Sequence, residues 1–438
     1  MSEASKQTTK TTSAGWRIVF AGIAWAAVVA GALVVMSMTG YKPEGPDSWT
    51  YDWRTYLFSQ TAKTPRKDIA VILITEDTLA EYDYLSPTDR GLMATLVRAI
   101  DAAKPKAIGL DFFYDRKSEA AKTADLIEAI KNAQAPVVVG AIDRRFNVKP
   151  ENFQYQDNFI KSANAQAGQV FLGRELERMK LDEQVIRYIG AGLSDSPYSK
   201  SFAATVAGVN GPKAEPMNRH IAWLLSSAGS DLFPTFRIPR HMPGADMDAI
   251  LKPSWRTALK DKYVLVGVDM PGQDRHITPL SIWNGRKMPG VLIQAQILAQ
   301  YLDGRSLYTI PWRAELIILM LTAFFGFLVS SQWDSKRLDW VFYVSGLVVL
   351  GIAGGVLFSV YAVILPTTLL LLAWTAGVTG AHYSKGVLRR IRVVAQKVPL
   401  VHRHAKDAPE AITLEATAEN TGKGKGDGGN AMPDNIAT

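Results

Sequence analysis

Four stretches of this 438-residue chain are long and apolar enough to cross a lipid bilayer, and they limit the folds open to it. The first, residues 18–38, carries no charged residue, and three others follow near the C-terminal end, at 314–331, 341–360 and 362–381. A helix of about 20 residues, rising about 1.5 Å per residue, spans a hydrocarbon layer of roughly 30 Å. The sequence therefore predicts four transmembrane helices, one before residues 39–313 and three after them.

The first apolar stretch is longer than the core of a cleaved signal peptide, which has about 7–15 apolar residues, so we expect it to stay as an anchor. Basic residues mark the cytoplasmic side of a membrane protein. They precede this stretch at Lys6, Lys10 and Arg17, and they fill the loop after the second stretch at Lys336 and Arg337. We therefore expect a multi-pass protein of a bacterial inner membrane, with both termini cytoplasmic and its main domain periplasmic.

The polar block between the spans begins with a pattern typical of a β-α-β unit. Residues 69–75 form a nearly continuous β-branched run, residues 91–103 place apolar side chains on one helical face, and residues 106–113 read as another strand. Strands that alternate with helices indicate an α/β fold with a mostly parallel, helix-covered sheet. The predicted fold class is therefore α/β in the extracytoplasmic domain, joined to four transmembrane helices.

Further along the block the same alternation continues and then loosens. Helices are predicted at 123–132 and 291–302, and strands at 136–142 and 263–268. Within residues 145–260, glycine and proline are frequent, and we expect insertions or an antiparallel edge there. Short strand candidates in this middle part are residues 169–172, 185–189 and 232–238.

Several pieces of the block, taken in order, resemble one family of membrane proteins. They are Tyr51-Asp52-Trp53-Arg54, I-L-I-T-E-D-T-L at 72–79, Pro87 with Arg90, K-A-I-G-L-D-F-F at 106–113, D-E-Q-V-I-R at 182–187, S-F-A at 201–203, Y-V-L-V-G-V-D-M-P-G-Q-D-R-H-I-T-P-L at 263–280 and M-P-G-V-L-I-Q-A-Q-I-L-A-Q-Y-L at 288–302. With the arrangement of spans, this order resembles the CHASE2 family of extracytoplasmic sensor domains. The resemblance implies one span before the domain, three after it, and a sensor role.

The chain departs from the family pattern in three places. Thr75 stands where the first strand usually has the first residue of an acidic pair, and the turn before Arg90 is reduced to S-P-T-D at 86–89. CHASE2 chains typically continue into a cytoplasmic cyclase or kinase. Residues 382–438 are too few for such a catalytic domain. The resemblance therefore implies a receptor without its own output domain.

Five charged or titratable residues near predicted strand ends are candidates for a ligand site: Glu76, Arg90, Asp111, Asp274 and His276. Parallel sheets bind ligands at the carboxyl ends of their strands, so the acidic residues can converge there, with Arg90 holding an anion. The alternative is structural, with Asp111 and Arg90 forming a buried ion pair or capping turns.

Composition and motifs exclude several chemistries. The chain has no cysteine, which excludes disulfides, zinc–thiolate sites, iron–sulfur clusters and cysteine nucleophiles. It also lacks the phosphate-binding loop, a G-x-G-x-x-G dinucleotide fingerprint after a predicted strand, the H-E-x-x-H pair and the G-x-S-x-G elbow. His276 has no histidine partner at helical spacing. We therefore expect no catalytic residues, no cofactor and no metal.

The segment after the last span, residues 382–406, reads as a basic juxtamembrane helix. Its apolar stripe is Val387, Ile391, Val394 and Val398, and its basic residues include Arg389, Arg390 and Arg392. Such a helix either lies on anionic lipid or docks a partner or a second copy of the chain. The net charge of +8 is compatible with nucleic-acid binding. The basic cluster, however, adjoins a membrane span, so we expect it to contact anionic lipid headgroups rather than nucleic acid. Residues 407–438 are predicted to be disordered.

Two functional hypotheses follow. In the first, the protein relays a periplasmic ligand or protein signal to a separate signalling partner. In the second, it is a structural or assembly subunit of an envelope complex and uses the outer domain for protein docking. Small residues recur every four positions at Gly22, Ala26 and Ala30, and again at Gly351 and Gly355. This spacing suits helix packing within one chain or between the two copies of a homodimer.

Overall fold

The computed structural model describes residues 3–38, 44–172, 185–190, 192–211, 213, 219–227, 231–246, 252–332 and 336–397. The chain divides into two compact units, Met1–Lys385 and Gly386–Thr438. In the second unit, the described residues are the last turns of helix α11 (Thr367–Lys397).

The outer domain is built on a six-stranded sheet in which every paired strand is parallel to its neighbour. In spatial order the strands are β5 (Gln166–Gln169), β4 (Val137–Ala141), β3 (Ala107–Phe113), β8 (Tyr263–Asp269), β2 (Ile69–Thr75) and β7 (Thr235–Arg237). The coarse sequence prediction of an α/β fold with a mostly parallel sheet is confirmed. Of the two features expected within residues 145–260, insertions or an antiparallel edge, the second is wrong for the described strands, because both edge strands of the sheet, β5 and β7, pair in parallel.

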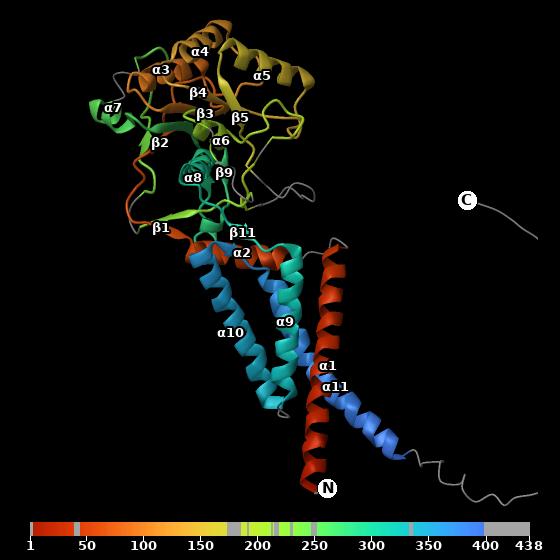
Figure 1. The fold of residues 1–438 in the computed structure, drawn as a ribbon. Helices are drawn as coiled ribbons and strands as arrows, with labels where there is room; N and C mark the ends of the chain where they lie inside the picture. Colours follow the sequence, from red (N-terminus) through yellow and green to blue (C-terminus); the bar gives the residue numbers. More distant parts are fainter. Residues whose placement is uncertain are drawn as a thin grey trace, which may run out of the picture. The chain divides into compact units, whose positions relative to one another are not determined.

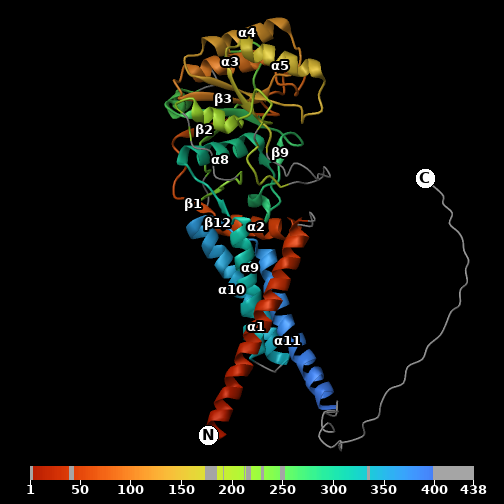
Figure 2. The same ribbon diagram turned by 45° about the vertical axis from the view of Figure 1, so that its right-hand side comes forward.

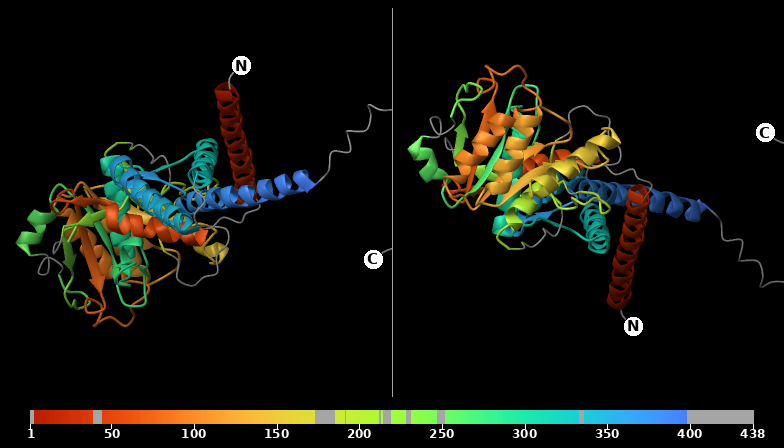
Figure 3. Two further views of the ribbon diagram at one scale, coloured as in Figure 1. Left: turned by 90° about the horizontal axis from the view of Figure 1, so that it is seen from below. Right: turned by 90° about the horizontal axis from the view of Figure 1, so that it is seen from above.

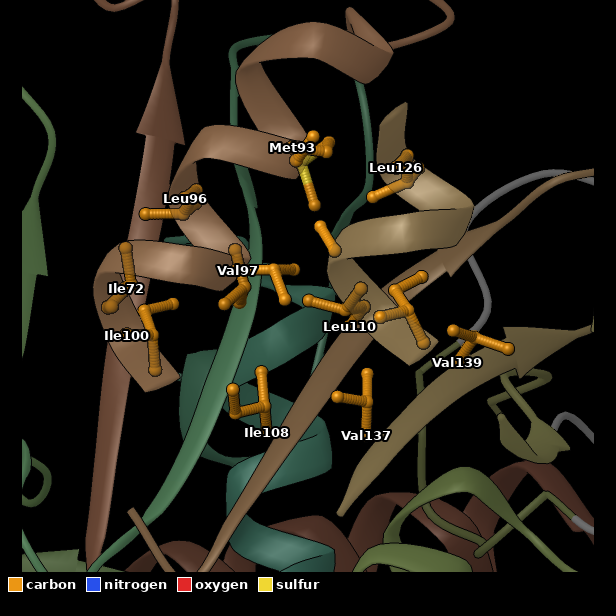
Figure 4. Packing of buried hydrophobic residues seen from close by; sticks show 14 of the residues in the cluster. Ile72, Met93, Leu96, Val97, Ile100, Ile108, Leu110, Leu126, Val137 and Val139 are labelled. Atoms are coloured by element: carbon orange, nitrogen blue, oxygen red, sulfur yellow. The ribbon is translucent and has the colours of Figure 1, made fainter. Parts of the chain in front are cut away.

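Alternate residues of the central strands supply two hydrophobic cores, one on each face of the sheet. In β2, Ile72 and Ile74 belong to a core formed with α3 (Arg90–Asp101), α4 (Ala120–Asn132), α5 (Pro150–Ser162) and α7 (Pro253–Leu259). Figure 3 (right) shows α3, α4 and α5 over this face of the sheet, and Figure 4 shows Ile72 beside Leu96 and Ile100 of α3. Ile69, Val71 and Leu73 face α6 (Phe202–Gly208) and α8 (Gly290–Asp303). Burial of each aliphatic side chain contributes about 1.5–3 kcal/mol to the stability of the fold. A strand buried on both faces therefore has a nearly continuous apolar sequence.

Short elements complete the outer domain. β1 (Gln60–Ala62) pairs in parallel with β6 (Leu224–Ser226), and β9 (Arg275–His276) pairs antiparallel with β10 (Met288–Pro289). A 3-10 helix, η2 (Pro279–Ser281), lies in the loop that connects β9 to β10. Three strands were predicted in the middle of the sequence. The strand predicted at 232–238 is observed as the shorter β7, and the one predicted at 169–172 is observed a few residues earlier as β5. The strand predicted at 185–189 is not formed, and this segment makes only an isolated bridge at Tyr188.

Helix α2 (Glu44–Phe58) contains the Tyr51-Asp52-Trp53-Arg54 piece, for which no helix was predicted. Figures 1 and 2 show it lying across the ends of α9 (Trp312–Ser331) and α10 (Lys336–Tyr361). Its weak apolar periodicity explains the omission, because polar and aromatic residues alternate along it.

Four long helices lie where the apolar stretches were predicted: α1 (Glu3–Met38), α9, α10 and α11. Only two of the described helices, at Trp312–Ser331 and Trp340–Tyr361, have both the length and the apolar composition of a membrane span. By this criterion the prediction of four membrane spans is not confirmed. In α1, the apolar segment among the residues whose side chains the structure describes is Ile18–Leu33. Threonine, glycine and His382 dilute the apolar character of α11.

The last predicted span also begins later than expected. Residues 362–366 are not helical, because Val363–Ile364 form strand β12, which pairs with β11 (Tyr308–Thr309) before α11 begins at Thr367. Pro366 precedes the first helical residue and lacks the N–H that a helix interior requires. The turn between α10 and α11 is thereby joined to the end of the outer domain.

Candidate functional site

A cavity of about 520 Å³ lies at the edge of the sheet formed by the carboxyl ends of its strands. It is bordered by the end of β3, the segments after β5 and β8, the segment before α3 and the first turns of α8. Its polar lining residues are Ser86, Thr88, Arg90, Asp111, Asp115, Arg116, Gln273, Asp274, His276 and Gln294. Its aromatic lining residues are Phe112, Phe113, Tyr114, Phe146 and Phe171. This is a usual size and place for a ligand site in a parallel sheet.

The cavity exists because β3 leaves its neighbours before it ends. Pairing of β3 with β8 stops at Leu110, although β8 continues to Asp269 beside β2. On its other side, the register of β3 with β4 shifts between Leu110 and Phe113. Such irregularities bend a strand and redirect its side chains. Asp111 lies within this irregular part of β3 and borders the cavity.

Asp111 accepts no hydrogen bond and forms no ion pair within the described part of the chain. Burial, followed by the nearby charge of Asp274, raises the pKa of the Asp111 carboxyl well above its usual range. A partly buried carboxylate without a donor is costly to maintain, and such groups cluster at functional sites.

Asp274 approaches the cavity from the loop between β8 and β9, where its backbone is left-handed, with φ of 45°. Its carboxylate lies 2.9 Å from His276 Nε2 and packs against the first residue of α8, Gly290. A Cβ atom at Gly290 would lie 2.5 Å from Asp274 Oδ2, so only glycine permits this approach. The backbone bond from Gly290 N to Asp274 O, 2.9 Å long, fixes the loop to the helix.

Arg90 lines the cavity but binds the protein itself. Its guanidinium donates to Thr123 Oγ1 and Tyr155 Oη, both at 2.7 Å, and to the Arg116 carbonyl. Its side chain also lies over three aromatic rings, those of Tyr114, Tyr155 and Phe159. A buried ion pair between Arg90 and Asp111, the structural alternative in the sequence analysis, is therefore wrong, because neutral oxygens and ring faces occupy this arginine.

Glu76 does not reach the cavity. It is exposed in the turn that follows β2, and it is absent from the cavity lining. Thr75, the last residue of β2, is bonded to the same turn: Thr75 N donates to Thr78 Oγ1 at 3.0 Å, and Thr78 Oγ1 donates to the Ile238 carbonyl at 2.5 Å. Four of the five predicted site residues thus line one cavity, and the fifth lies outside it.

Sequence reasoning missed Tyr114 and Gln294, which also line the cavity. Both are buried, and Tyr114 Oη and Gln294 Oε1 have no hydrogen-bond partner among the described residues. Gln294 had a detectable signal, because it is one of three glutamines in the otherwise apolar helix α8. The other two, Gln296 and Gln300, bond at both ends to the segment containing β6.

Comparison with known protein families matches residues 26–328 to the CHASE2 domain. The chain belongs to the CHASE2 family. The match begins within α1 and ends within α9, so it includes the whole sheet and every element around the cavity. CHASE2 domains are extracytoplasmic sensor domains, and α9 and α10 have the length and composition to place this one beside a membrane. Comparisons with curated proteins and with solved structures find no match.

Two expectations concern residues beyond the CHASE2 match. The side chains of Val387, Arg389, Arg390, Ile391, Arg392 and Val394 lie outside the described residues, although the backbone there belongs to α11. Residues 398–438, which include the predicted disordered tail, are also outside them. Within the described part of the chain, no three histidine, aspartate or glutamate side chains lie close enough together to hold a metal ion.

Proposed function

We propose that this CHASE2 protein is a membrane sensor that binds a small molecule in the cavity and transmits its presence to α11. The observation that carries the proposal is an unbroken series of contacts from the cavity to the first turn of that helix. CHASE2 domains are sensors as a family, and the contacts supply a physical route by which this one can act on the membrane helices.

The route begins in the loop that leaves the cavity at His276 and returns to it at Gly290. His276 pairs with Met288 in the β9–β10 ladder, so both ends of the loop are anchored beside the cavity. Inside the loop, Thr278 and Ser281 bond to each other, and Ser281 Oγ donates to the Arg286 carbonyl at 2.6 Å. These bonds stiffen the loop, so a displacement at the cavity is passed along it.

Helix α2 contacts the part of this loop that lies farthest along the chain from its two anchored ends. The ring of Trp283 packs edge-on against that of Trp53, with centroids 6.3 Å apart, and α2 contacts η2. The next residue of α2, Arg54, is buried and donates from Nη1 to the Leu365 carbonyl at 3.0 Å. One end of α2 thus contacts both the cavity loop and the segment that leads into α11.

The same helix caps the start of α11. Asp47 Oδ1 accepts a hydrogen bond from Thr368 N at 2.8 Å, which satisfies one of the free N–H groups in the first helical turn. A carboxylate at this position also interacts favourably with the helix dipole. A shift of α2 therefore changes both the capping of α11 and the bond at Leu365.

We further propose that α1 and α11 cross the membrane together with α9 and α10. Side chains of α1, α9 and α11 share one buried cluster that includes Ala26, Leu319, Ala323 and Ala373, and α10 contributes Leu350 and Leu357 to it. Trp25 Nε1 also donates to the Ala376 carbonyl at 2.9 Å. The basic residues Lys336 and Arg337, together with the basic cluster in the last turns of α11, then favour cytoplasmic termini and a periplasmic domain.

Topology can be tested cleanly because the chain has no native cysteine. Single cysteines at Lys117, in the outer domain, and at Gln332, at the end of α9, are both exposed. In intact spheroplasts, a membrane-impermeant maleimide is expected to label the variant Lys117→Cys and to label Gln332→Cys only after lysis. Labelling of Gln332→Cys in intact spheroplasts would contradict the orientation.

The sensor proposal is tested by crosslinked affinity purification of the tagged protein from its native membranes, followed by mass spectrometry. We expect to recover a kinase, cyclase or transcription regulator whose yield depends on residues 382–406. The variant Arg54→Ala is expected to change that yield. Arg98→Ala, which removes an exposed outer-domain arginine paired with Asp125, is the matched control and is expected to leave it unchanged.

A different result would support the scaffold hypothesis instead. Recovery of envelope-complex subunits at one fixed stoichiometry, equal in wild type, Arg54→Ala and Arg98→Ala, would show that no signal passes through α2. The sensor proposal would then be abandoned.

A further inference from the structure

We propose that the ligand of the cavity carries a protonated amine, which the carboxylate of Asp111 binds beside Asp274 and the carbonyl oxygen of Gln294. This inference rests on the proposed sensor function and specifies its ligand. The cavity residues offer more hydrogen-bond acceptors than their own donors satisfy, and an ammonium group supplies both the donors and the charge that are missing.

The surplus of acceptors is visible at two residues from separate elements. Asp111, on β3, accepts nothing from the described part of the chain. Gln294, on α8, donates from Nε2 to the Val170 carbonyl at 3.2 Å, which leaves Oε1 without a partner. Gln294 is only 2% exposed, and a buried acceptor of this kind costs about 1–3 kcal/mol while it stays unsatisfied. Gln296 and Gln300 on the same helix show that the fold satisfies both ends of a glutamine where no ligand is expected.

The protein's own cations near the cavity do not supply the missing charge. Arg90 is held by Thr123, Tyr155 and the Arg116 carbonyl. The side chain of Arg116 pairs with Asp115, with Nε 3.2 Å from Oδ1. His276 is shared with Asp274. Asp111 therefore remains without an opposite charge from any of these three neighbours, and an anionic ligand would add to the repulsion between Asp111 and Asp274.

The rest of the lining suits an amine with an apolar body. Phe113, Phe146 and Phe171 form one aromatic series, with ring centroids 5.9 and 6.0 Å apart along it, and Phe113 remains 39% exposed. Ring faces attract cations, and they also cover hydrocarbon. A volume of about 520 Å³ accommodates a small organic amine rather than a bare ion.

The test uses the full-length protein in detergent, and the shift in melting temperature is followed by the fluorescence of its 11 tryptophans. The probes are putrescine, spermidine, tyramine and phenethylamine. Their controls are 1,4-butanediol, phenethyl alcohol and phenylacetate, together with magnesium and calcium chloride. We expect at least one amine, and none of the controls, to raise the melting temperature in a concentration-dependent manner.

Three variants locate the binding. Asp111→Asn is expected to weaken the amine at least tenfold, since it removes a charge-assisted bond, and its fold is not at risk because the wild-type charge is unfavourable. Asp274→Asn keeps a residue type that tolerates positive φ, and we expect a smaller loss. Glu76→Gln removes a carboxylate that lies outside the cavity, and we expect wild-type binding.

The failures of the two proposals are distinguishable by fractionating a periplasmic extract on a cation exchanger. A stabilising component that is retained on the exchanger and requires Asp111 supports the amine. A component that flows through and still requires Asp111 overturns the amine and leaves the sensor cavity standing. An Asp111-dependent effect of magnesium or calcium, or an amine effect unchanged in Asp111→Asn, also overturns it. If no fraction acts and Arg54→Ala leaves the recovered partners unchanged, both proposals fail.

Discussion

The two halves of one sheet edge are built in opposite ways. At the ends of β2 and β8, Asp269 binds Arg275 and Arg237, and the hydroxyl of Thr78 connects Thr75 to Ile238. At the end of β3, a short distance along the same edge, Asp111 has no partner in the described chain. Both halves end in a buried or partly buried aspartate, but only one of these is neutralised by the protein.

This difference separates structure from function. A polar group that the fold satisfies for itself stabilises the protein and leaves nothing for a ligand to bind. An acceptor that the fold leaves open destabilises the free protein, and such a cost is retained at sites where a ligand later removes it. The closed half should therefore respond to mutation through stability, and the open half through binding.

The largest effect is expected at the closed half, from Asp269→Ala. Its carboxylate is buried, whereas Arg237 and Arg275 are 62% and 36% exposed, so the released arginines regain water. We expect a loss of about 2 kcal/mol, below the roughly 3–5 kcal/mol for fully buried pairs, or about 4–8 °C in melting temperature. Amine binding should persist at lower temperature. A loss of binding with unchanged melting temperature would break the distinction between the halves.

Thr78→Val should have the next largest effect. The substitution preserves shape but removes a fully buried hydroxyl that accepts from Thr75 N and donates to the Ile238 carbonyl. We expect a loss of about 1–2 kcal/mol, because two backbone groups lose their partner. Thr257→Val is the control, since its exposed hydroxyl only bonds within its own helix. Equal melting temperatures for Thr78→Val and the wild type would show that the turn after β2 is not a fixed structural element.

At the open half, the expected change in stability has the opposite sign. The substitution Asp111→Asn should stabilise the free protein. The raised pKa of Asp111 means that the folded state holds a proton that the unfolded chain releases above about pH 4. This stability is present below the unfolded pKa and is lost as the pH rises through the folded one. We therefore expect a gain of about 1 kcal/mol, or 2–4 °C, at pH 7 that shrinks towards pH 4.

Asp125→Asn is the matched control for that pH series, because Asp125 is exposed and paired with Arg98 on the surface of α3 and α4. It should show no such gain. An equal gain for Asp111→Asn at both pH values would mean that the amide packs better than the carboxyl, and that repulsion from Asp274 and burial do not control this site.

The sheet was largely predictable because burial on both faces leaves its mark in the sequence. Predicted strands at 69–75, 106–113, 136–142 and 263–268 correspond within one or two residues to β2, β3, β4 and β8. The edge strands were harder to predict, since β5 and β7 are short and only partly buried. The length of α11 was also misjudged, because hydropathy cannot show that residues 363–364 pair with 308–309.

The site was predictable only where chain position and spatial position agree. Carboxylates after strands were the right residue type, but the irregularity that turns Asp111 towards the cavity depends on where β3 leaves β8, which no local pattern encodes. Arg90 was expected to hold an anion, yet Tyr155 and Thr123, from helices that follow it in the sequence, occupy its guanidinium. Tertiary contacts of this kind decide whether a charged residue is available.

The smallest effect should come from Glu76→Gln, and it tests the comparison most directly. Glu76 comes directly after β2, and Asp111 lies near the end of β3. Their positions in the sequence therefore predict the same role for the two carboxylates. Glu76 is exposed and lies at the half whose polar groups are already satisfied. Its substitution should change stability by less than about 0.5 kcal/mol and leave amine binding at the wild-type level. If Glu76→Gln weakened binding as much as Asp111→Asn, both strand ends would contribute to the ligand site, and an unsatisfied acceptor would no longer distinguish functional from structural residues in this domain.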